Sequence, residues 1–136
     1  MKKRLLSLLL ILCLCAALLP AMVLAEDNVT IVKTKDQLEK AITEGGAIQL
    51  GEKIELTSAL DIKNTVILDL NGYKITRAES TGSATGSINA VNIKDGGHLT
   101  LTDSSNGIGA ISDFDGSVHV LAGGTFTMNG GRLLAG

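Results

Sequence analysis

Residues 90–102 read AVNIKDGGHLTLT, and residues 117–129 repeat the same pattern as SVHVLAGGTFTMN. Each matched position lies 27 residues further along the chain, as from Val91 to Val118 and from Leu99 to Phe126. In both copies apolar and polar residues alternate on either side of a double glycine, which is typical of two short strands joined by a tight corner. A repeat of this length predicts a solenoid in which successive copies stack on one another.

Shorter apolar pairs of the same kind fill the chain from residue 47 onward. Residues two apart in a strand point to the same side, so these pairs predict three inward faces of a stack of coils. The first face is expected to hold Leu60/Ile62, Val91/Ile93 and Val118/Val120. The second is expected to hold Leu68/Leu70, Leu99/Leu101 and Phe126/Met128, with Ile48/Leu50 in an incomplete first coil. The third is expected to hold Ile54/Leu56, Ile75, Ile108/Ile111 and Leu133.

Two kinds of connection are expected between these faces. The step from the first face to the second is six residues in every coil, from 62 to 68, from 93 to 99 and from 120 to 126. The glycines of Gly96-Gly97, Gly123-Gly124, Asn71-Gly72 and Asn129-Gly130 are expected to supply positive φ at corners. Residues 76–89 form a polar Gly/Ser/Thr insertion between two coils, where a loop leaves the stack.

The N-terminal segment has the features of a secretory signal peptide. Lys2, Lys3 and Arg4 precede an apolar run that ends at Val23-Leu24-Ala25, so we expect cleavage after Ala25. An uncleaved membrane anchor is the alternative, although the run is shorter than a membrane span requires. Both cysteines lie within residues 1–25, so the mature chain has none and forms no disulfide.

The mature chain is mildly acidic and forms one domain. The signal contains three of the 12 basic residues and none of the 14 acidic ones, which leaves a net charge of 9 − 14 = −5. A chain of this charge without basic clusters is a poor binder of nucleic acid. We therefore expect no nucleic-acid partner, no membrane contact after signal cleavage, and a secreted or cell-surface location.

A short amphipathic helix is predicted just before the coils. Val29 to Val32 is a strand candidate, and Thr34 with Gln37 has the spacing of a capping box. Leu38, Ala41 and Ile42 follow at helical spacing until Gly45-Gly46, which predicts a helix of two to three turns. It precedes the first coil, where a solenoid needs a cover. We therefore divide the chain into a signal peptide (1–25), a strand and capping helix (26–46), and coils (47–136).

The coils resemble those of a known family. The segments TVILDLNGYKI from Thr65, GGHLTLTDSS from Gly96 and GGTFTMNGG from Gly123 are similar to coils of secreted bacterial right-handed parallel β-helix proteins, the pectin-lyase-like architecture. They most resemble its large cell-surface members. The resemblance implies an all-β fold, a three-faced right-handed parallel β-helix with an N-terminal capping α-helix. It covers essentially the whole mature chain, but its motifs are corner and core residues that specify no chemistry.

No catalytic residue, metal ligand or cofactor site can be assigned from the sequence, although polysaccharide lyases and hydrolases share the architecture. Asp69 faces outward beside Thr100 and Thr127, which makes no carboxylate pair. Asp113-Phe-Asp-Gly116 resembles part of a calcium loop, but two carboxylates and a glycine are not a coordination set. His98 and His119, the chain's two histidines, are expected to face outward on different faces.

The expected function is that of an exported structural or adhesin-like segment of a bacterial cell-surface protein. The alternative is a carbohydrate-binding or pectate-lyase-like polysaccharide-degrading β-helix whose active region lies in further coils. A glycan or host-surface ligand is the expected partner. The candidate contacts are Tyr73, Arg77, Glu79, Asp113 and Asp115. Tyr73 and Phe114 are expected at partly buried corners, and Phe126 inside.

The last copy of the repeat stops at Gly136 without a cap pattern. We therefore expect the chain to be the N-terminal part of a longer protein. End-to-end self-association through an open C-terminal coil is the alternative.

Overall fold

The computed structural model describes residues 28–79 and 86–136. The predicted signal peptide lies outside the described residues. Within the described part of the chain, no helix is long and apolar enough to cross a membrane. The chain there is mostly β-structure with one short helix, as the alternating pairs predicted.

The strands are short and separated by tight corners. They are β1 (Thr30–Val32), β2 (Gly46–Leu50), β3 (Ile54–Leu56), β4 (Leu60–Ile62), β5 (Thr65–Asp69), β6 (Lys74–Arg77), β7 (Asn89–Ile93), β8 (His98–Thr102), β9 (Ala110–Phe114), β10 (Gly116–Val120), β11 (Thr125–Met128) and β12 (Arg132–Ala135). The helix α2 spans Lys35–Glu44.

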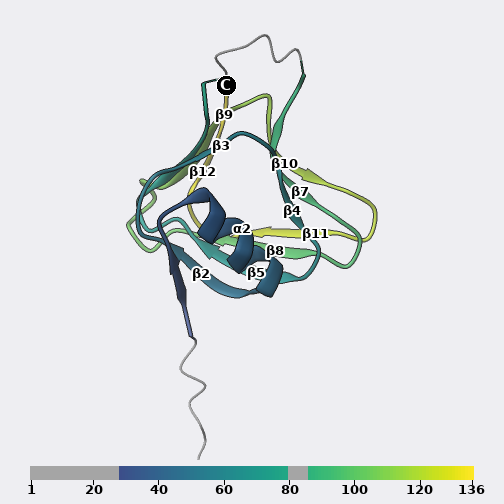
Figure 1. Ribbon diagram of the computed structural model, residues 1–136, viewed down its shortest axis with the longest axis horizontal. Helices are drawn as coiled ribbons and strands as arrows, with labels where there is room; N and C mark the ends of the chain where they lie inside the picture. Colours follow the sequence, from purple (N-terminus) through teal and green to yellow (C-terminus); the bar gives the residue numbers. More distant parts are fainter. Residues whose placement is uncertain (1–27, 80–85) are drawn as a thin grey trace, which may run out of the picture.

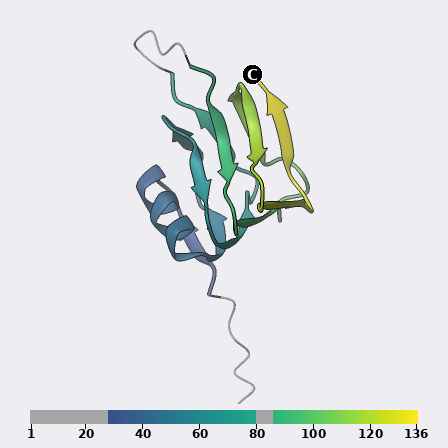
Figure 2. The same ribbon diagram turned by 90° about the vertical axis from the view of Figure 1, so that its right-hand side faces the viewer.

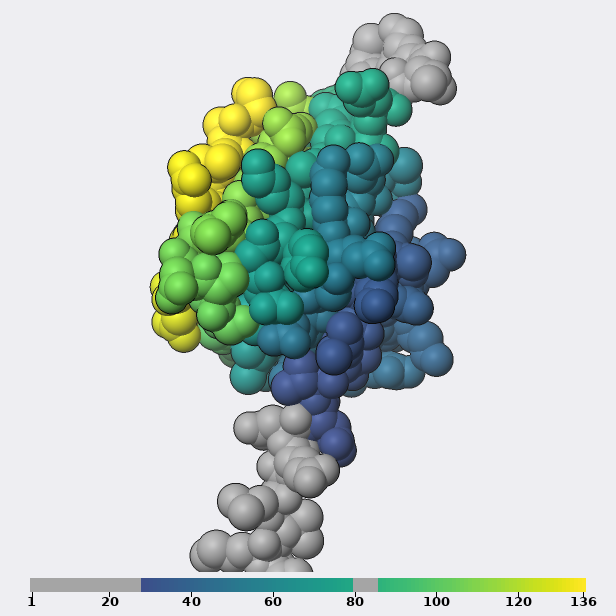
Figure 3. Space-filling view, turned by 90° about the vertical axis from the view of Figure 1, so that its left-hand side faces the viewer, coloured from purple at the N-terminus to yellow at the C-terminus, as the bar shows by residue number. Residues whose placement is uncertain are grey.

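The strands form three parallel sheets that the chain visits in rotation. The sheet orders are β1-β2-β5-β8-β11, β10-β7-β4 and β12-β9-β6-β3. In the view of Figure 1 the three sheets form the sides of a triangle around the apolar interior. Successive turns of the chain lie next to one another, and Figure 3 shows them as bands of colour from the N-terminal to the C-terminal part.

The predicted first face is confirmed residue by residue. Leu60, Val91 and Val118 are in register, and so are Ile62, Ile93 and Val120. In β4 and β7 these side chains are almost completely buried. Val120 in β10 is 43% exposed, because its strand has no partner on the far side among the described residues.

The second face differs from the prediction by two residues in one coil. Leu99 and Leu101 pair with Phe126 and Met128 as expected. On their other side, however, their partners are Val66 and Leu68 rather than Leu68 and Leu70. The corner after Ile62 has only two residues between strands, whereas the corner after Ile93 has four. The constant step of six residues is therefore wrong for this coil. Leu70 is still buried, at the next corner.

The third face contains a second correction. Ile54, Ile75, Ile111 and Leu133 align across the sheet, as predicted. Ile108, by contrast, lies before β9 and is 65% exposed. Phe114, at the other end of β9, is completely buried and is thus no ligand contact. The polar insertion is also shorter than predicted, since β6 extends to Arg77 and β7 begins at Asn89.

Helix α2 has the predicted caps and buried face. The Thr34 hydroxyl accepts a hydrogen bond from Gln37 N, and the Gln37 side chain accepts one from Lys33 N. Leu38, Ala41 and Ile42 are buried in the same apolar cluster as the strands. Figure 2 shows α2 at the end of the stack formed by the earliest strands, away from β12.

The two glycines of each double-glycine corner have different roles. Gly96 and Gly123 have φ of 77° and 80°, as predicted. The second glycines lack this conformation but lie against the preceding coil, and a Cβ on Gly97 would come within 2.3 Å of the Ile62 carbonyl oxygen. The prediction for Asn129-Gly130 is wrong, because the positive φ falls on Gly131. Gly130 instead lies close to Asp103 N, where a Cβ would be 2.9 Å away.

Candidate functional site

The Asp69 carboxylate accepts hydrogen bonds at the corner that follows β5. Its Oδ1 accepts hydrogen bonds from Asn71 N at 2.9 Å and from Ser104 N at 2.8 Å. Its Oδ2 accepts one from Gln49 Nε2 at 2.8 Å. These donors come from three successive coils, so the carboxylate ties the coils together at this corner.

Asp103 holds the same corner in the next coil. Its Oδ1 accepts from Gly72 N at 2.8 Å and from both the backbone and the hydroxyl of Ser105. Its Oδ2 accepts from Gly109 N at 2.7 Å. The carboxylate thereby fixes the loop that leads into β9 and joins it to the preceding coil.

The hydrogen bonds at this corner favour the charged form of both carboxylates. Burial alone would raise the pKa of Asp69, but the hydrogen bonds from Gln49, Ser104 and Asn71 outweigh it and lower the pKa below 3.8. For Asp103, burial is likewise outweighed by the bonds from Ser105, Gly109 and Gly72, which lower its pKa. A general acid at neutral pH needs a raised pKa, so neither group suits that role.

A groove crosses the outer side of the sheet that contains β3, β6 and β9. Its volume is about 600 Å³. It is lined by Lys53, Glu55, Thr76, Arg77, Ala78, Glu79 and Asp113. The structure thus brings together three of the five predicted ligand contacts from two coils that are far apart in the sequence.

The charges of the groove are only partly paired. Lys53 Nζ lies 2.9 Å from Glu55 Oε1, and Arg77 Nη1 lies 3.0 Å from Asp115 Oδ2. Glu79 and Asp113 form no ion pair with any residue of the described part of the chain. The groove therefore holds two paired cations and two exposed carboxylates that have no ion-pair partner among the described residues.

Two hydroxyl groups lie beneath these charges. Thr76 is only 6% exposed, and its Oγ1 has no hydrogen-bond partner among the described residues. Ser112, its register partner, donates from Oγ to Asp113 Oδ2 at 2.8 Å. Asp113 has a φ of 68°, which is a conformation that asparagine and aspartate adopt more readily than other side chains. A polar floor with an unused hydroxyl suits a ligand that forms hydrogen bonds.

The two remaining predicted contacts do not line the groove. Asp115 is occupied by Arg77 and by Ile88 N, which donates to its Oδ2 at 2.9 Å. Tyr73 is 39% exposed and lies before the start of β6, while the groove lies at its end. Tyr73 therefore does not combine with Arg77 and Glu79 in one site.

Sequence reasoning missed Lys53, Glu55 and Thr76, although a signal was present. Ile54 and Ile75 were assigned to one inward column. The residues that follow them, Glu55 and Thr76, must then face outward and lie next to each other. The register confirms that Glu55 and Thr76 are partners. Extending the predicted columns to their outward neighbours would have found two of the three residues.

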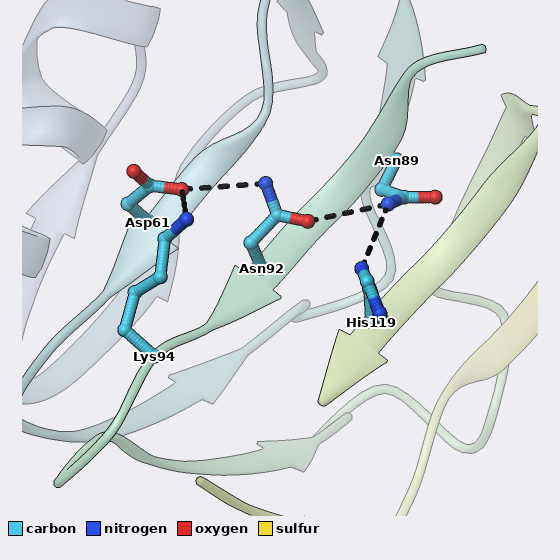
Figure 4. Close-up of polar contacts among 5 residues, drawn as sticks. All are labelled: Asp61, Asn89, Asn92, Lys94 and His119. Atoms are coloured by element: carbon cyan, nitrogen blue, oxygen red, sulfur yellow. Dashed lines mark hydrogen bonds and ion pairs between the residues drawn. The ribbon is translucent and has the colours of Figure 1, made fainter. Parts of the chain in front are cut away.

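A row of polar side chains runs across the outer side of the sheet β10-β7-β4 (Figure 4). Asp61, Asn92 and His119 are register partners on β4, β7 and β10. Asn92 Nδ2 donates to Asp61 Oδ1 at 3.3 Å, and Asn89 Nδ2 lies within 3.2 Å of Asn92 Oδ1 and 3.3 Å of His119 Nδ1. Lys94 Nζ lies 3.5 Å from Asp61 Oδ1. These side chains mainly bind one another, which stabilises neighbouring strands.

Neither histidine belongs to a metal site in the part of the chain that is described. No group of three or more His, Cys, Asp or Glu residues there has the arrangement of metal ligands. His98 and His119 are both exposed and belong to different sheets, as the alternation predicted. What the described surface offers is hydrogen bonding and charge pairing in a groove.

Comparison with known proteins gave no relative on which to base an assignment. No family model matches the chain, no curated protein matches its sequence, and no solved structure matches its fold.

Proposed function

We propose that this chain is an exported structural or adhesin-like segment of a bacterial cell-surface protein, built as a three-faced right-handed parallel β-helix of the pectin-lyase-like kind. The observation that carries the proposal is the set of in-register aliphatic columns, such as Ile62, Ile93 and Val120, across strands that recur in each turn of the chain. Stacked coils of this kind form a rigid rod whose length grows with the number of repeats.

The distribution of polar groups supports a scaffold over an enzyme. The carboxylates of Asp69 and Asp103 accept hydrogen bonds from backbone N–H groups and neighbouring side chains. The polar row of Asp61, Asn92 and His119 likewise joins strand to strand. In this proposal the chain has no catalytic group of its own, and the N-terminal segment directs it out of the cell.

The test is expression of the full chain in a bacterial host, followed by analysis of the exported protein. The proposal expects an exported product that lacks residues 1–25 and resists protease. It also expects no release of products from acidic or neutral polysaccharides, with or without calcium. Retention in the cytoplasm would contradict the export, and turnover of any of these polysaccharides would contradict the scaffold role.

Carbohydrate binding is the second candidate function, and the groove on β3, β6 and β9 is the observation that favours it. Free carboxylates and an arginine beside buried hydroxyls are groups that bind sugar hydroxyls through hydrogen bonds. A glycan array with the purified chain tests this. The variants Glu79→Gln and Asp113→Asn should weaken any signal, while Asp95→Asn, an exposed site outside the groove, should not.

A further inference from the structure

The sheet that contains β4 begins two strands later than the neighbouring sheet that contains β5. The sheet β1-β2-β5-β8-β11 has two strands before β5, whereas β4 is itself the edge of the sheet β10-β7-β4. Among the described residues no further strand pairs with β4, and the helix α2 lies beside this edge and contacts β4. Figure 2 shows the helix beside this edge.

The backbone of β4 offers unpaired hydrogen-bonding groups on that side. Lys94 N donates to Ile62 O, so the backbone groups of Ile62 face β7. In a parallel ladder successive residues face opposite sides, and the N–H and C=O of Asp61 must therefore face α2. Among the described residues, no hydrogen bond uses either of them. An edge with a free N–H and a free C=O is a template for another strand.

A groove of about 430 Å³ lies along this edge. Its lining combines residues of the β4 segment with residues of α2, namely Ala59, Leu60, Asp61, Lys63 and Asn64 with Glu39, Ile42 and Thr43. Ile42 and Leu60 are buried core residues and give it an apolar floor. Glu39, Asp61 and Lys63 leave its rim with a net charge of −1.

Asn64, at one end of the groove, has an unused acceptor. Its Nδ2 donates to Thr43 O at 2.9 Å, which fixes the side chain against the end of α2. Its Oδ1 is buried and has no partner within the described part of the chain. Leaving a buried acceptor without a donor raises the free energy of the folded chain. A ligand that supplies an N–H group here would recover that energy.

We propose that this groove binds an extended peptide, which adds as a strand to the edge of β4. The peptide backbone pairs with the N–H and C=O of Asp61, and an apolar side chain enters between Ile42 and Leu60. A lysine or arginine of the peptide, next to that side chain, forms ion pairs with Glu39 and Asp61. The present ion-pair partners of these acids, Lys35 and Lys94, lie 3.5 Å from them at the surface. This binding mode is β-strand addition. It is independent of the groove on β3, β6 and β9.

The probe is a capped nine-residue peptide in which valine alternates with lysine and threonine. The matched control is the same peptide with N-methylated backbone nitrogens at its three central residues, which keeps the charge but removes the donors. Amide hydrogen exchange of the full chain is followed by NMR with each peptide. At a peptide concentration ten times the Kd, exchange of the Asp61 amide should slow roughly tenfold. The N-methylated peptide should leave it unchanged.

Two protein variants locate the site. Thr43→Tyr fills the groove from the exposed side of α2 and should abolish the effect on Asp61. Lys40→Tyr places the same side chain on α2 outside the groove and should have no effect. Equal binding of both peptides, binding that leaves Asp61 unchanged, or no binding at about 1 mM would overturn the proposal. Protection of Asp61 by dimerisation without any peptide would assign the edge to a second copy of this chain and also overturn it.

Discussion

The corner at Asp69 and Asp103 and the groove at Glu79 and Asp113 use the same chemical group in opposite ways. At the corner each carboxylate accepts bonds from backbone N–H groups of neighbouring coils. In the groove Glu79 and Asp113 have no cationic partner among the described residues, and both are exposed. The difference shows that the number of donors around an acid, rather than its place in a repeat, separates a structural carboxylate from one that is free for a ligand.

The largest expected effect comes from introducing a carboxylate into the core, where no group can donate a hydrogen bond to it. Ile93 is completely buried in the middle of its column, between Ile62 and Val120. Ile93→Asp places a charge there without a partner and should cost about 4 kcal/mol or more, which is enough to prevent folding. Circular dichroism with urea unfolding measures this. Ile93→Val, the control, should lose only about 1 kcal/mol. A cooperative transition at the wild-type midpoint for Ile93→Asp would place this residue outside the core.

A smaller loss is expected when a corner carboxylate is removed. Asp103→Ala leaves Gly72 N and Gly109 N without their acceptor and should lower the free energy of unfolding by about 1 to 3 kcal/mol. Asp103→Asn keeps one acceptor oxygen and should lose less. The urea midpoints of the two variants give the comparison. If both match the wild type, the corner bonds contribute nothing measurable.

The corner should also make the fold sensitive to acid. The pKa values of Asp69 and Asp103 are lowered in the folded chain from 3.8, so as the pH falls the unfolded chain binds protons first. Their contribution is complete well above pH 3.8 and is lost as the pH falls through the lowered pKa values. Unfolding in urea from neutral pH to about pH 3 measures the decline. A double variant, Asp69→Asn with Asp103→Asn, should show a flatter decline, and an unchanged slope would contradict the assignment.

The smallest effect is expected in the groove. Glu79→Gln and Asp113→Asn remove charges that form no ion pair among the described residues, and asparagine keeps an oxygen that can accept the hydrogen bond from Ser112, so the free energy of unfolding should change by about 0.5 kcal/mol or less. Asparagine tolerates the φ of 68° at position 113 as well as aspartate does. Thermal unfolding is sufficient to detect a difference. A loss above about 1 kcal/mol would move these acids into the structural class with Asp103.

Much of the fold could be predicted because its signals are local and repeated. The 27-residue offset gave the register of β7 with β10 and of β8 with β11 without error. The capping box at Thr34 and Gln37 and the buried face of α2 follow from spacing within one helix. Such features need no knowledge of the rest of the molecule.

The failures occurred where one coil departs from the repeat. The corner of Lys63 and Asn64 is two residues shorter than that of residues 94–97, and it lacks the double glycine of the longer corner, but the alternation alone does not give its length. Ile108 was expected inside and Phe114 at a partly buried corner, but the structure exposes Ile108 and buries Phe114 completely. The positive φ of Asp113, next to Phe114, could not be read from the alternation. In the candidate site, Arg77, Glu79 and Asp113 were identified singly. That they share a groove depends on the pairing of β6 with β9 across the insertion.

The rotation of the chain through three sheets also determines how far apart contacting residues lie in the sequence. Strand partners are separated by 18 residues at the shortest, between Thr30 and Ile48, and by 36 at the longest, between Ile75 and Ile111. Closing a loop of this length costs little entropy, and no strand has to wait for a distant part of the chain. Folding can therefore advance one coil at a time as the polypeptide emerges from a ribosome, with each finished coil acting as the template for the next.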